Sequence, residues 1–294
     1  MSAQNRSPED VLAVDFHVHV ELGPDGEDRL SPKLRRAAMR YFKGGPELAT
    51  IDEIADYYRE RGMLAVVFGV DSALTTGQRI PNDFIVAKAR EHSDVLIPFA
   101  SVDPRRGHEA VAEARELLEE GTIRGFKFHP NTQQFYPNDR MAYSLYQLIQ
   151  DAGAIALFHT GHSGIGAGLP GGGGIRLKYG NPMAIDDVAV DFPEMSIVMA
   201  HPSFPWQDEA LSIAMHKPQV SIDLSGWTPK RFPPQLTKAM SSDLMRQTLF
   251  GTDFPLITPD RWMEDFATLD LKPEVRSAIL KENALRILGI GHVG

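Results

Sequence analysis

The sequence predicts a (β/α)8 TIM barrel, a fold in which eight parallel strands alternate with helices. Two observations support this prediction. Short apolar runs recur eight times along the chain, and each is followed by a segment whose apolar residues have helical spacing. The length of 294 residues also suits a barrel of about 250 residues with insertions. A doubly wound open sheet is the alternative, because periodicity does not show whether the sheet closes.

The predicted strands are short apolar runs bounded by glycine or polar residues. In chain order they cover residues 11–20, 63–70, 95–102, 123–129, 154–160, 195–201, 219–225 and 247–253.

The predicted helices lie between these strands, and glycines such as Gly62, Gly121 and Gly289 mark their ends. Asn138 is a predicted N-cap. The helices cover residues 32–41, 51–61, 81–92, 107–120, 138–152, 182–192, 206–216, 234–245, 260–269 and 273–288.

Two segments interrupt the alternation of strands and helices. The first is a polar insertion after strand one, residues 21–49, and the second is a glycine-rich loop after strand five, residues 161–180. There is no internal repeat beyond the β-α alternation and no linker that divides the chain. We therefore expect a single domain over residues 1–294.

The composition excludes several classes of protein. Hydrophobic residues make up 43% of the chain and charged residues 23%, and no run approaches the roughly 18 apolar residues of a membrane helix. Residues 1–10 lack the pattern of a secretory signal. A net charge of −9 argues against nucleic-acid binding, which needs a basic face. We expect a cytoplasmic enzyme that acts on a small molecule, with a homodimer as a possible assembly.

Five of the ten histidines fall at the ends of predicted strands. His17 and His19 end strand one, where residues i and i+2 project from one face. The other strand-end residues are His129, His159, His201 and Asp253, on strands four, five, six and eight. Because the C-terminal ends of barrel strands meet at one mouth, these six side chains should converge there.

This group of side chains predicts a metal centre. The chain has no cysteine, so imidazole and carboxylate are its strong metal donors. Three imidazoles and a carboxylate suit one divalent ion, zinc first and manganese or iron as alternatives. We expect the ligands His17, His19, His159 and Asp253, with His201 beside the metal. A second metal would need a bridging ligand, and the only candidate is a carbamylated Lys127. We favour a single metal ion.

Further residues are candidates for substrate binding. His129 and Lys127 lie on strand four, and Trp227 follows strand seven, where an aromatic ring could form a wall for a flat substrate. His162 and Arg176 lie in the loop 161–180, which we expect to act as a lid, with Arg176 able to meet an anion. The basic insertion segment 29–43 could serve a carboxylate or phosphate if it reaches the mouth.

Two other motifs fail on context. Gly166, Gly168 and Gly171 form a G-x-G-x-x-G pattern, but it does not sit directly between a strand and a helix, as a dinucleotide site requires. The segment 161–165 nearly matches a nucleophile elbow, yet Ile165 stands where the last glycine should be. A serine hydrolase is therefore not expected.

The chain resembles the amidohydrolase superfamily, in particular the amidohydrolase-2 branch, which includes γ-resorcylate and aminocarboxymuconate semialdehyde decarboxylases and metal-dependent hydrolases of aromatic catabolism. The resemblance extends over nearly the whole chain, on the motifs DFHVH at 15–19, GFKFHP at 125–130, FHTG at 158–161, MAHP at 199–202, FGTDFP at 250–255 and ENALRILG at 282–289. It implies a metal held by His17, His19, His159 and Asp253, with His201 catalytic. Some decarboxylases of the branch carry Glu at the first position of the histidine pair, and this chain has His17 there.

The expected reaction is hydrolysis of a carbonyl compound by a metal-activated water, with Asp253 moving the proton and His201 stabilising the oxyanion. The expected substrate is an aromatic or unsaturated carboxylic acid or a β-ketoacyl thioester. The alternative is non-oxidative decarboxylation of a hydroxybenzoate-like acid. A third hypothesis is a binding or regulatory protein that keeps the barrel without turnover, and it predicts a closed or absent metal site.

Overall fold

The computed structural model describes residues 8–42 and 48–291, and it shows a barrel of eight parallel strands whose spatial order follows the chain. The strands are β1 (Val14–His19), β2 (Leu64–Phe68), β3 (Leu96–Ala100), β4 (Gly125–Phe128), β5 (Ile155–His159), β6 (Ser196–Ala200), β7 (Val220–Asp223) and β8 (Thr248–Leu249). All eight lie inside the ranges predicted from the sequence.

Backbone hydrogen bonds between β1 and the segment that continues β8 close the barrel. Phe16 N donates to Phe250 O at 3.0 Å, Asp253 N donates to His17 O at 3.0 Å, and His19 N donates to Phe254 O at 2.9 Å. The barrel prediction is therefore confirmed, and the open sheet is excluded.

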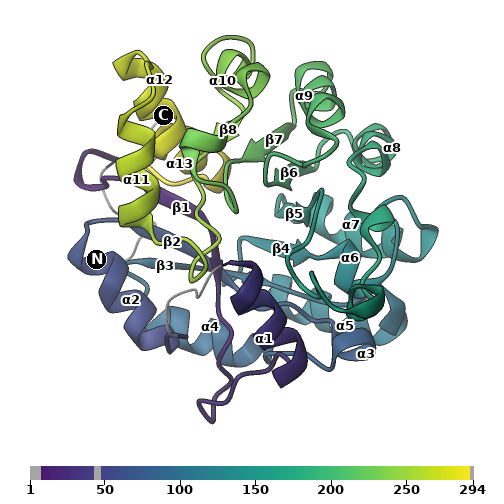
Figure 1. Cartoon of the computed structure of the whole chain (residues 1–294). Helices are drawn as coiled ribbons and strands as arrows, with labels where there is room; N and C mark the ends of the chain where they lie inside the picture. Colours follow the sequence, from purple (N-terminus) through teal and green to yellow (C-terminus); the bar gives the residue numbers. More distant parts are fainter. Residues whose placement is uncertain (1–7, 43–47, 292–294) are drawn as a thin grey trace.

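The helices surround the strands (Figure 1). They are α1 (Pro32–Tyr41), α2 (Ile51–Glu60), α3 (Ala73–Thr76), α4 (Asn82–Glu91), α5 (His108–Glu119), α6 (Pro130–Gln133), α7 (Tyr143–Asp151), α8 (Met183–Asp191), α9 (Gln207–His216), α10 (Pro234–Met240), α11 (Pro259–Ala267), α12 (Pro273–Ser277) and α13 (Asn283–Leu288). Of the helices in the described part of the chain, none is both long and apolar enough to cross a membrane.

Three helix boundaries differ from the prediction. Asn138 is not an N-cap, because its side-chain amide donates to Asp187 at 2.7 Å, and α7 begins only after a 3-10 turn, η4 (Arg140–Ala142). The helix predicted over 234–245 ends at Met240. The last helix is divided by a π-helical turn, η8 (Ala278–Glu282). Residues 1–7 and 43–47, which hold parts of the predicted N-terminus and insertion, lie outside the described residues.

Alternate residues of each strand pack on opposite faces of the barrel wall. On β2, Ala65 and Val67 belong to the large core between barrel and helices, whereas Val66 and Phe68 belong to the smaller core inside the barrel. This alternation is the period-2 pattern of a strand buried on both sides.

Strand β1 breaks this alternation, and the break positions the histidine pair. Val14 and Phe16 pack in the interior core, so regular alternation would turn His17 and His19 outward. The register with β2 shifts between Asp15 and Val18, and Val18 packs on the helix side. A bulge of this kind re-aims side chains next to a functional site. It directs both imidazoles into the mouth.

Candidate metal centre and substrate pocket

The structure brings His17, His19 and Asp253 together at the mouth of the barrel. Nε2 of His17 lies 3.2 Å from Nε2 of His19, and Oδ1 of Asp253 lies 3.5 Å from the first nitrogen and 3.1 Å from the second. Each residue offers one ligand atom, and these atoms all lie within 4.8 Å of one another. Side chains so arranged suit a divalent ion with nitrogen and oxygen ligands.

The other strand-end histidines lie beside this group. Nε2 of His201 is 3.0 Å from Nδ1 of His159, and the rings of His129 and His159 stack with centroids 3.9 Å apart. His159 stands outside the closest three-residue group but lines the same cavity as His19 and Asp253. Nδ1 of His129 and Nε2 of His159 are buried without a hydrogen-bond partner among the described residues. Buried nitrogens of this kind are available to a ligand.

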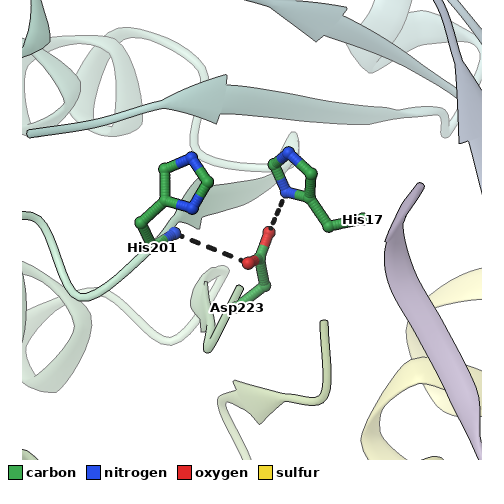
Figure 2. A group of neighbouring side chains, drawn as sticks. All are labelled: His17, His201 and Asp223. Carbon is green, nitrogen blue, oxygen red and sulfur yellow. Dashed lines mark hydrogen bonds and ion pairs between the residues drawn. The ribbon is translucent and has the colours of Figure 1, made fainter. Parts of the chain in front are cut away.

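Asp223 and Ser225 contact His17 and His201 from behind, and neither role was predicted from the sequence. Figure 2 shows the Asp223 carboxylate between the ring of His17 and the backbone of His201. Oδ2 of Asp223 lies 2.9 Å from Nδ1 of His17. The hydroxyl of Ser225 contacts Oδ1 of Asp223 and lies 2.8 Å from Nδ1 of His201. His17, His201 and Asp223 also offer ligand atoms that lie close together. Because the Ser225 hydroxyl lies among them and bonds to Asp223 and His201, these residues form a hydrogen-bonded set rather than a metal site.

The carboxylate of Asp223 fixes where the protons lie. Because a carboxylate only accepts hydrogen bonds, His17 donates to it from Nδ1, and its Nε2 carries a lone pair that faces His19 and Asp253. Ser225 likewise donates to the carboxylate and so accepts from Nδ1 of His201. Nε2 of His201 then accepts from Nδ1 of His159, which leaves the lone pair of His159 at its unpartnered Nε2.

Burial keeps His17 and His159 neutral. It lowers the pKa of His17 well below the usual value, reinforced by the charge of Lys127, and it likewise lowers the pKa of His159, reinforced by His129. For Asp253 burial opposes ionisation, but the hydrogen bond with His19 and the nearby imidazoles hold its pKa below the ordinary value. Neutral imidazoles beside an ionised carboxylate are the protonation states that metal ligation requires.

Lys127 lies directly behind the histidine pair. Its side chain is fully buried, and Nζ lies 3.0 Å from Nε2 of His17. Burial lowers the pKa of Lys127 to about 8, against the opposing charges of Asp223 and Asp253. The structure thus places Lys127 next to the expected metal ligands rather than on the wall of the substrate cavity.

Backbone geometry at two of these residues is unusual. His201 and Asp253 both have φ of 71°, in the left-handed region that residues other than glycine seldom adopt. Strain of this kind collects at functional sites. Gly226 is also required, because a Cβ atom there would lie 2.7 Å from Nδ1 of His201.

Two adjoining cavities open onto the site. The inner one has a volume of about 60 Å³ and is lined by polar groups that include Glu21, Gln78 and His129. The outer one has a volume of about 370 Å³, within the range of about 300–1,000 Å³ that is usual for small-molecule pockets. Both are lined by His159, His201 and Asp253, so a molecule in either one reaches the same reactive centre.

Aromatic rings form a wall of the outer cavity. His162 lies between Tyr41 and Phe204, with ring centroids 5.6 Å and 6.4 Å away, and Phe204 contacts Trp227 at 5.8 Å. Tyr41 ends α1, so the insertion reaches the mouth through aromatic side chains. His162 and Trp227 both line this cavity, and their role in substrate binding stays a prediction.

The basic residues of the cavity are not the expected ones. Arg176 is exposed, bonds to Gln134 at 3.3 Å, and does not line either cavity. In the insertion, Arg35 is paired with Glu21 and Asp28. Instead Arg231 and Arg261 line the outer cavity, after β7 and β8. Their position after strand ends was the available signal in the sequence.

The chain is similar to one family of known proteins and to several solved structures. A family model described as "Amidohydrolase" matches residues 14–290. No curated protein matches the chain. Among solved structures, an uncharacterized TIM-barrel protein from Bordetella bronchiseptica is 24% identical with a TM-score of 0.76, and the match covers 94% of this chain and 98% of that one.

Two further solved structures carry names of enzymes. A probable 2-pyrone-4,6-dicarboxylic acid hydrolase from Acinetobacter baumannii, with citric acid bound, is 15% identical with a TM-score of 0.63, over 95% of this chain and 99% of that one. A 5-carboxyvanillate decarboxylase from Novosphingobium aromaticivorans, complexed with manganese and a nitrobenzoic acid, is 12% identical with a TM-score of 0.68, over 99% and 100%. At these identities the likeness shows the fold.

Proposed function

The chain belongs to the amidohydrolase family, and from this membership and the geometry of the mouth we propose that it is a metal-dependent hydrolase of a carbonyl compound. The substrate class is an aromatic or unsaturated carboxylic acid or a β-ketoacyl thioester. The observation that carries the proposal is the convergence of His17, His19 and Asp253 beside the unpartnered Nε2 of His159.

These side chains fit one divalent ion, zinc by preference and manganese as the alternative. Asp223 orients His17 so that its lone pair faces His19 and Asp253, which is the usual part of a carboxylate behind a metal-binding histidine. An ion held there would polarise a carbonyl oxygen and lower the pKa of a water molecule. Manganese bound in the decarboxylase from Novosphingobium aromaticivorans supports the alternative metal.

The chain's own residues would move the proton. The Asp253 carboxylate takes a proton from the attacking water and returns it to the leaving group. His201 would take up a proton from solvent at Nε2, in place of the hydrogen bond that this nitrogen accepts from His159, and would donate a hydrogen bond to the oxygen that gains negative charge. Ser225 links Nδ1 of His201 to the carboxylate of Asp223. The buried carboxylate of Asp223, at the end of these two hydrogen bonds, stabilises the imidazolium form of His201.

The inner cavity has room for the water that the proposed hydrolysis consumes. Its volume of about 60 Å³ exceeds what one water molecule needs, and Glu21, Gln78 and His129 are polar groups of its lining. His19, His159 and Asp253 line the same cavity, so a water held there would lie beside the proposed metal centre.

A second candidate is non-oxidative decarboxylation, in which a carboxylate leaves as CO₂ and Asp253 delivers a proton to carbon. The observation that favours it is that several solved structures with this fold are named decarboxylases of hydroxylated or methoxylated benzoic acids. The presence of His17 in place of Glu favours the hydrolase.

The test combines metal analysis with a product screen. Elemental analysis of the wild type is expected to give about one zinc or manganese per chain, and His17→Ala is expected to lose it. His108→Ala, at an exposed histidine of α5, is the matched control and should keep the metal. Absence of metal from the wild type, and no activity after zinc or manganese is added, would contradict the proposal.

The screen offers aromatic β-keto thioesters and hydroxybenzoates to the metal-loaded protein. Release of a free thiol or acid without CO₂ supports hydrolysis. Release of CO₂ from a hydroxybenzoate would overturn hydrolysis in favour of the second candidate.

A further inference from the structure

Two arginines at the outer cavity have side chains without a partner among the described residues. Arg231 lies in the 3-10 turn η7 (Pro229–Arg231) and Arg261 in α11, and both line the cavity that contains His201 and Asp253. Neither side chain forms an ion pair or hydrogen bond with any residue that the structure describes. Their neighbours behave differently. Lys230, next to Arg231, pairs with Asp265 at 3.2 Å.

A shortage of carboxylates does not explain why Arg231 and Arg261 lack partners among the described residues. The chain carries 39 acidic against 30 basic residues, and Asp260, next to Arg261, is engaged by Arg61 at 2.8 Å. Both arginines are exposed side chains at the cavity, and neither has an ion-pair partner among the described residues although the chain has an excess of carboxylates. A negative charge supplied from the cavity would complete them.

Thr228 gives an independent indication of a ligand at the same place. Its side chain is 7% exposed, and its hydroxyl is buried with no hydrogen-bond partner among the described residues. It lines the same cavity, three positions before Arg231. A buried hydroxyl without a partner costs free energy, so the site is incomplete until an acceptor binds there.

The rest of the cavity surface is mostly apolar. Trp227, Phe42, Leu256 and Ile257 line it together with the reactive residues and the arginines. An apolar body with charged groups is the kind of molecule that such a lining accepts.

We propose that the substrate carries a second anionic group, a carboxylate or a phosphate-type oxyanion, which Arg231, Arg261 and Thr228 bind while the reacting group lies at the metal centre. The assignment of the reacting end rests on the proposed function, but the anion site itself does not. The substrate class is thereby narrowed to dianionic aromatic or unsaturated acids.

Calorimetric titration with matched probes tests this proposal. The probes are benzoate with one anionic group, three dicarboxylates of increasing reach (isophthalate, terephthalate and 4-carboxyphenylacetate), and 4-phosphonobenzoate. At least one dianion is expected to bind wild type about tenfold or more tightly than benzoate, since charge-assisted bonds to arginine are strong. A larger advantage for the phosphonate than for the dicarboxylates would assign the site to phosphate-type groups.

Variants locate the effect. The double variant Arg231→Gln and Arg261→Gln is expected to lose the advantage of the dianion and to keep the affinity for benzoate. Lys230→Gln, an exposed neighbour already paired with Asp265, is the control and should behave as wild type. Thr228→Val, which removes the unpaired hydroxyl at nearly constant volume, should weaken dianion binding about fivefold without loss of stability.

Each titration is run on metal-loaded and on metal-free protein, so that the two proposals fail separately. Equal binding of benzoate and every dianion to wild type, or an advantage that survives in the double variant, would overturn the anion site. A dianion advantage that depends on the arginines would support the anion site whether or not metal is present. If benzoate and the dianions all bind as tightly to the metal-free as to the metal-loaded protein, the metal centre is not the place of the reacting group.

Discussion

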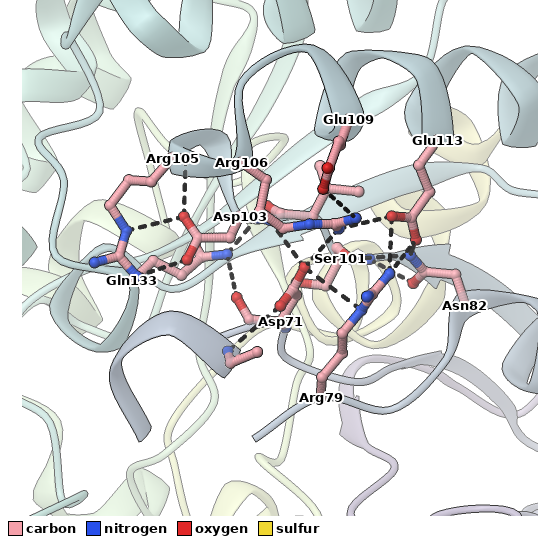
Figure 3. A network of polar contacts seen from close by, with 12 residues as sticks. Asp71, Arg79, Asn82, Ser101, Asp103, Arg105, Arg106, Glu109, Glu113 and Gln133 are labelled. Atoms are coloured by element: carbon pink, nitrogen blue, oxygen red, sulfur yellow. Dashed lines mark hydrogen bonds and ion pairs between the residues drawn. The ribbon is translucent and has the colours of Figure 1, made fainter. Parts of the chain in front are cut away.

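Two sectors of the barrel mouth hold buried charged side chains, and they differ in how those charges are partnered. The loops after β2 and β3, with α4, α5 and α6, carry an acid–arginine network (Figure 3). We define it as Asp71, Arg79, Asn82, Ser101, Asp103, Arg105, Arg106, Glu113 and Gln133. The metal-centre sector lies on β1, β5, β6, β7 and the ends of β4 and β8.

In the acid–arginine network the protein supplies the partners. Nη1 of Arg106 lies 3.1 Å from Asp71 and 2.7 Å from Glu113, and Arg105 lies 2.6 Å from Asp103. Asp71 and Asp103 are fully buried, so this pairing offsets their desolvation. The network holds the loops in place and offers no open carboxylate to a ligand.

In the metal-centre sector the imidazoles outnumber their partners. Nδ1 of His129 and Nε2 of His159 have no hydrogen-bond partner among the described residues. Nε2 of His17 lies close to both Nζ of Lys127 and Nε2 of His19. The two sectors meet at Gln133, which accepts from His129 N at 2.7 Å and donates to Asp71 O at 2.8 Å. Each charged side chain of the acid–arginine network has a partner of opposite charge, although Nε of Arg79 forms no hydrogen bond. The comparison teaches that charges paired within the protein mark a structural cluster, whereas unpartnered imidazole nitrogens beside a cavity mark a place for a ligand.

The largest expected effect comes from Asp253→Asn, which keeps the shape of the side chain and removes its charge. We expect kcat/KM to fall by at least about 10³-fold and metal content to fall with it, because the carboxylate serves as ligand and proton carrier. Turnover and elemental analysis measure the two effects. Asp260→Asn, on the surface, is the control, and activity above a tenth of wild type in Asp253→Asn would contradict the assignment.

The next effect separates the two sectors directly. Asp71→Asn leaves Arg106 and Arg79 without their buried carboxylate and is expected to lower the free energy of unfolding by about 3–5 kcal/mol, with metal content unchanged. His159→Gln is expected to show the reverse, with loss of metal and little change in the stability of the metal-free protein. Urea denaturation and elemental analysis of both variants test the contrast. If both variants lost similar amounts of metal and of stability, the proposed difference between the two sectors would be wrong.

A pH effect follows from Lys127. Its pKa is about 8 in the folded protein, against the ordinary 10.5, because burial disfavours the charged amine. Between these two values the unfolded chain binds more protons, so the free energy of unfolding rises with pH, by about 3 kcal/mol in all. Denaturation of metal-free wild type and Lys127→Met from pH 7 to 10.5 measures it. Parallel curves for the two proteins would show that Lys127 is not the source.

The smallest effect concerns Ser225. Ser225→Ala removes the hydroxyl that joins Asp223 to His201 and lies 3.0 Å from Nδ1 of His17. We expect the metal affinity to weaken about tenfold, as for other residues that orient metal ligands. Ser221→Ala, at a buried serine of β7 four positions earlier, is the matched control. Competition with a chelator measures the affinity, and equal values for both variants would exclude the orienting role.

The sequence determined the strand ends, because apolar alternation and glycine punctuation are local properties of the chain. All eight strands and the helix over 32–41 follow from it. The strand-end histidines and Asp253 could also be found, since barrel topology brings such positions to one mouth whatever the details of packing. Phe204 and Trp227 lie at the mouth for the same reason.

Only the tertiary structure decided which face these residues present and what they contact. Regular alternation on β1 would have turned His17 and His19 toward the helices, and it is the bulge against β2 that directs them inward. Asp223 contacts His17 across 206 positions of sequence, and no local pattern distinguishes it from an ordinary polar strand residue. Arg231 and Arg261 follow strand ends in the sequence, but their lack of partners among the described residues cannot be read from it. Whether an arginine is paired or open depends on the carboxylates that folding brings near it, and that is a property of the whole barrel rather than of any segment.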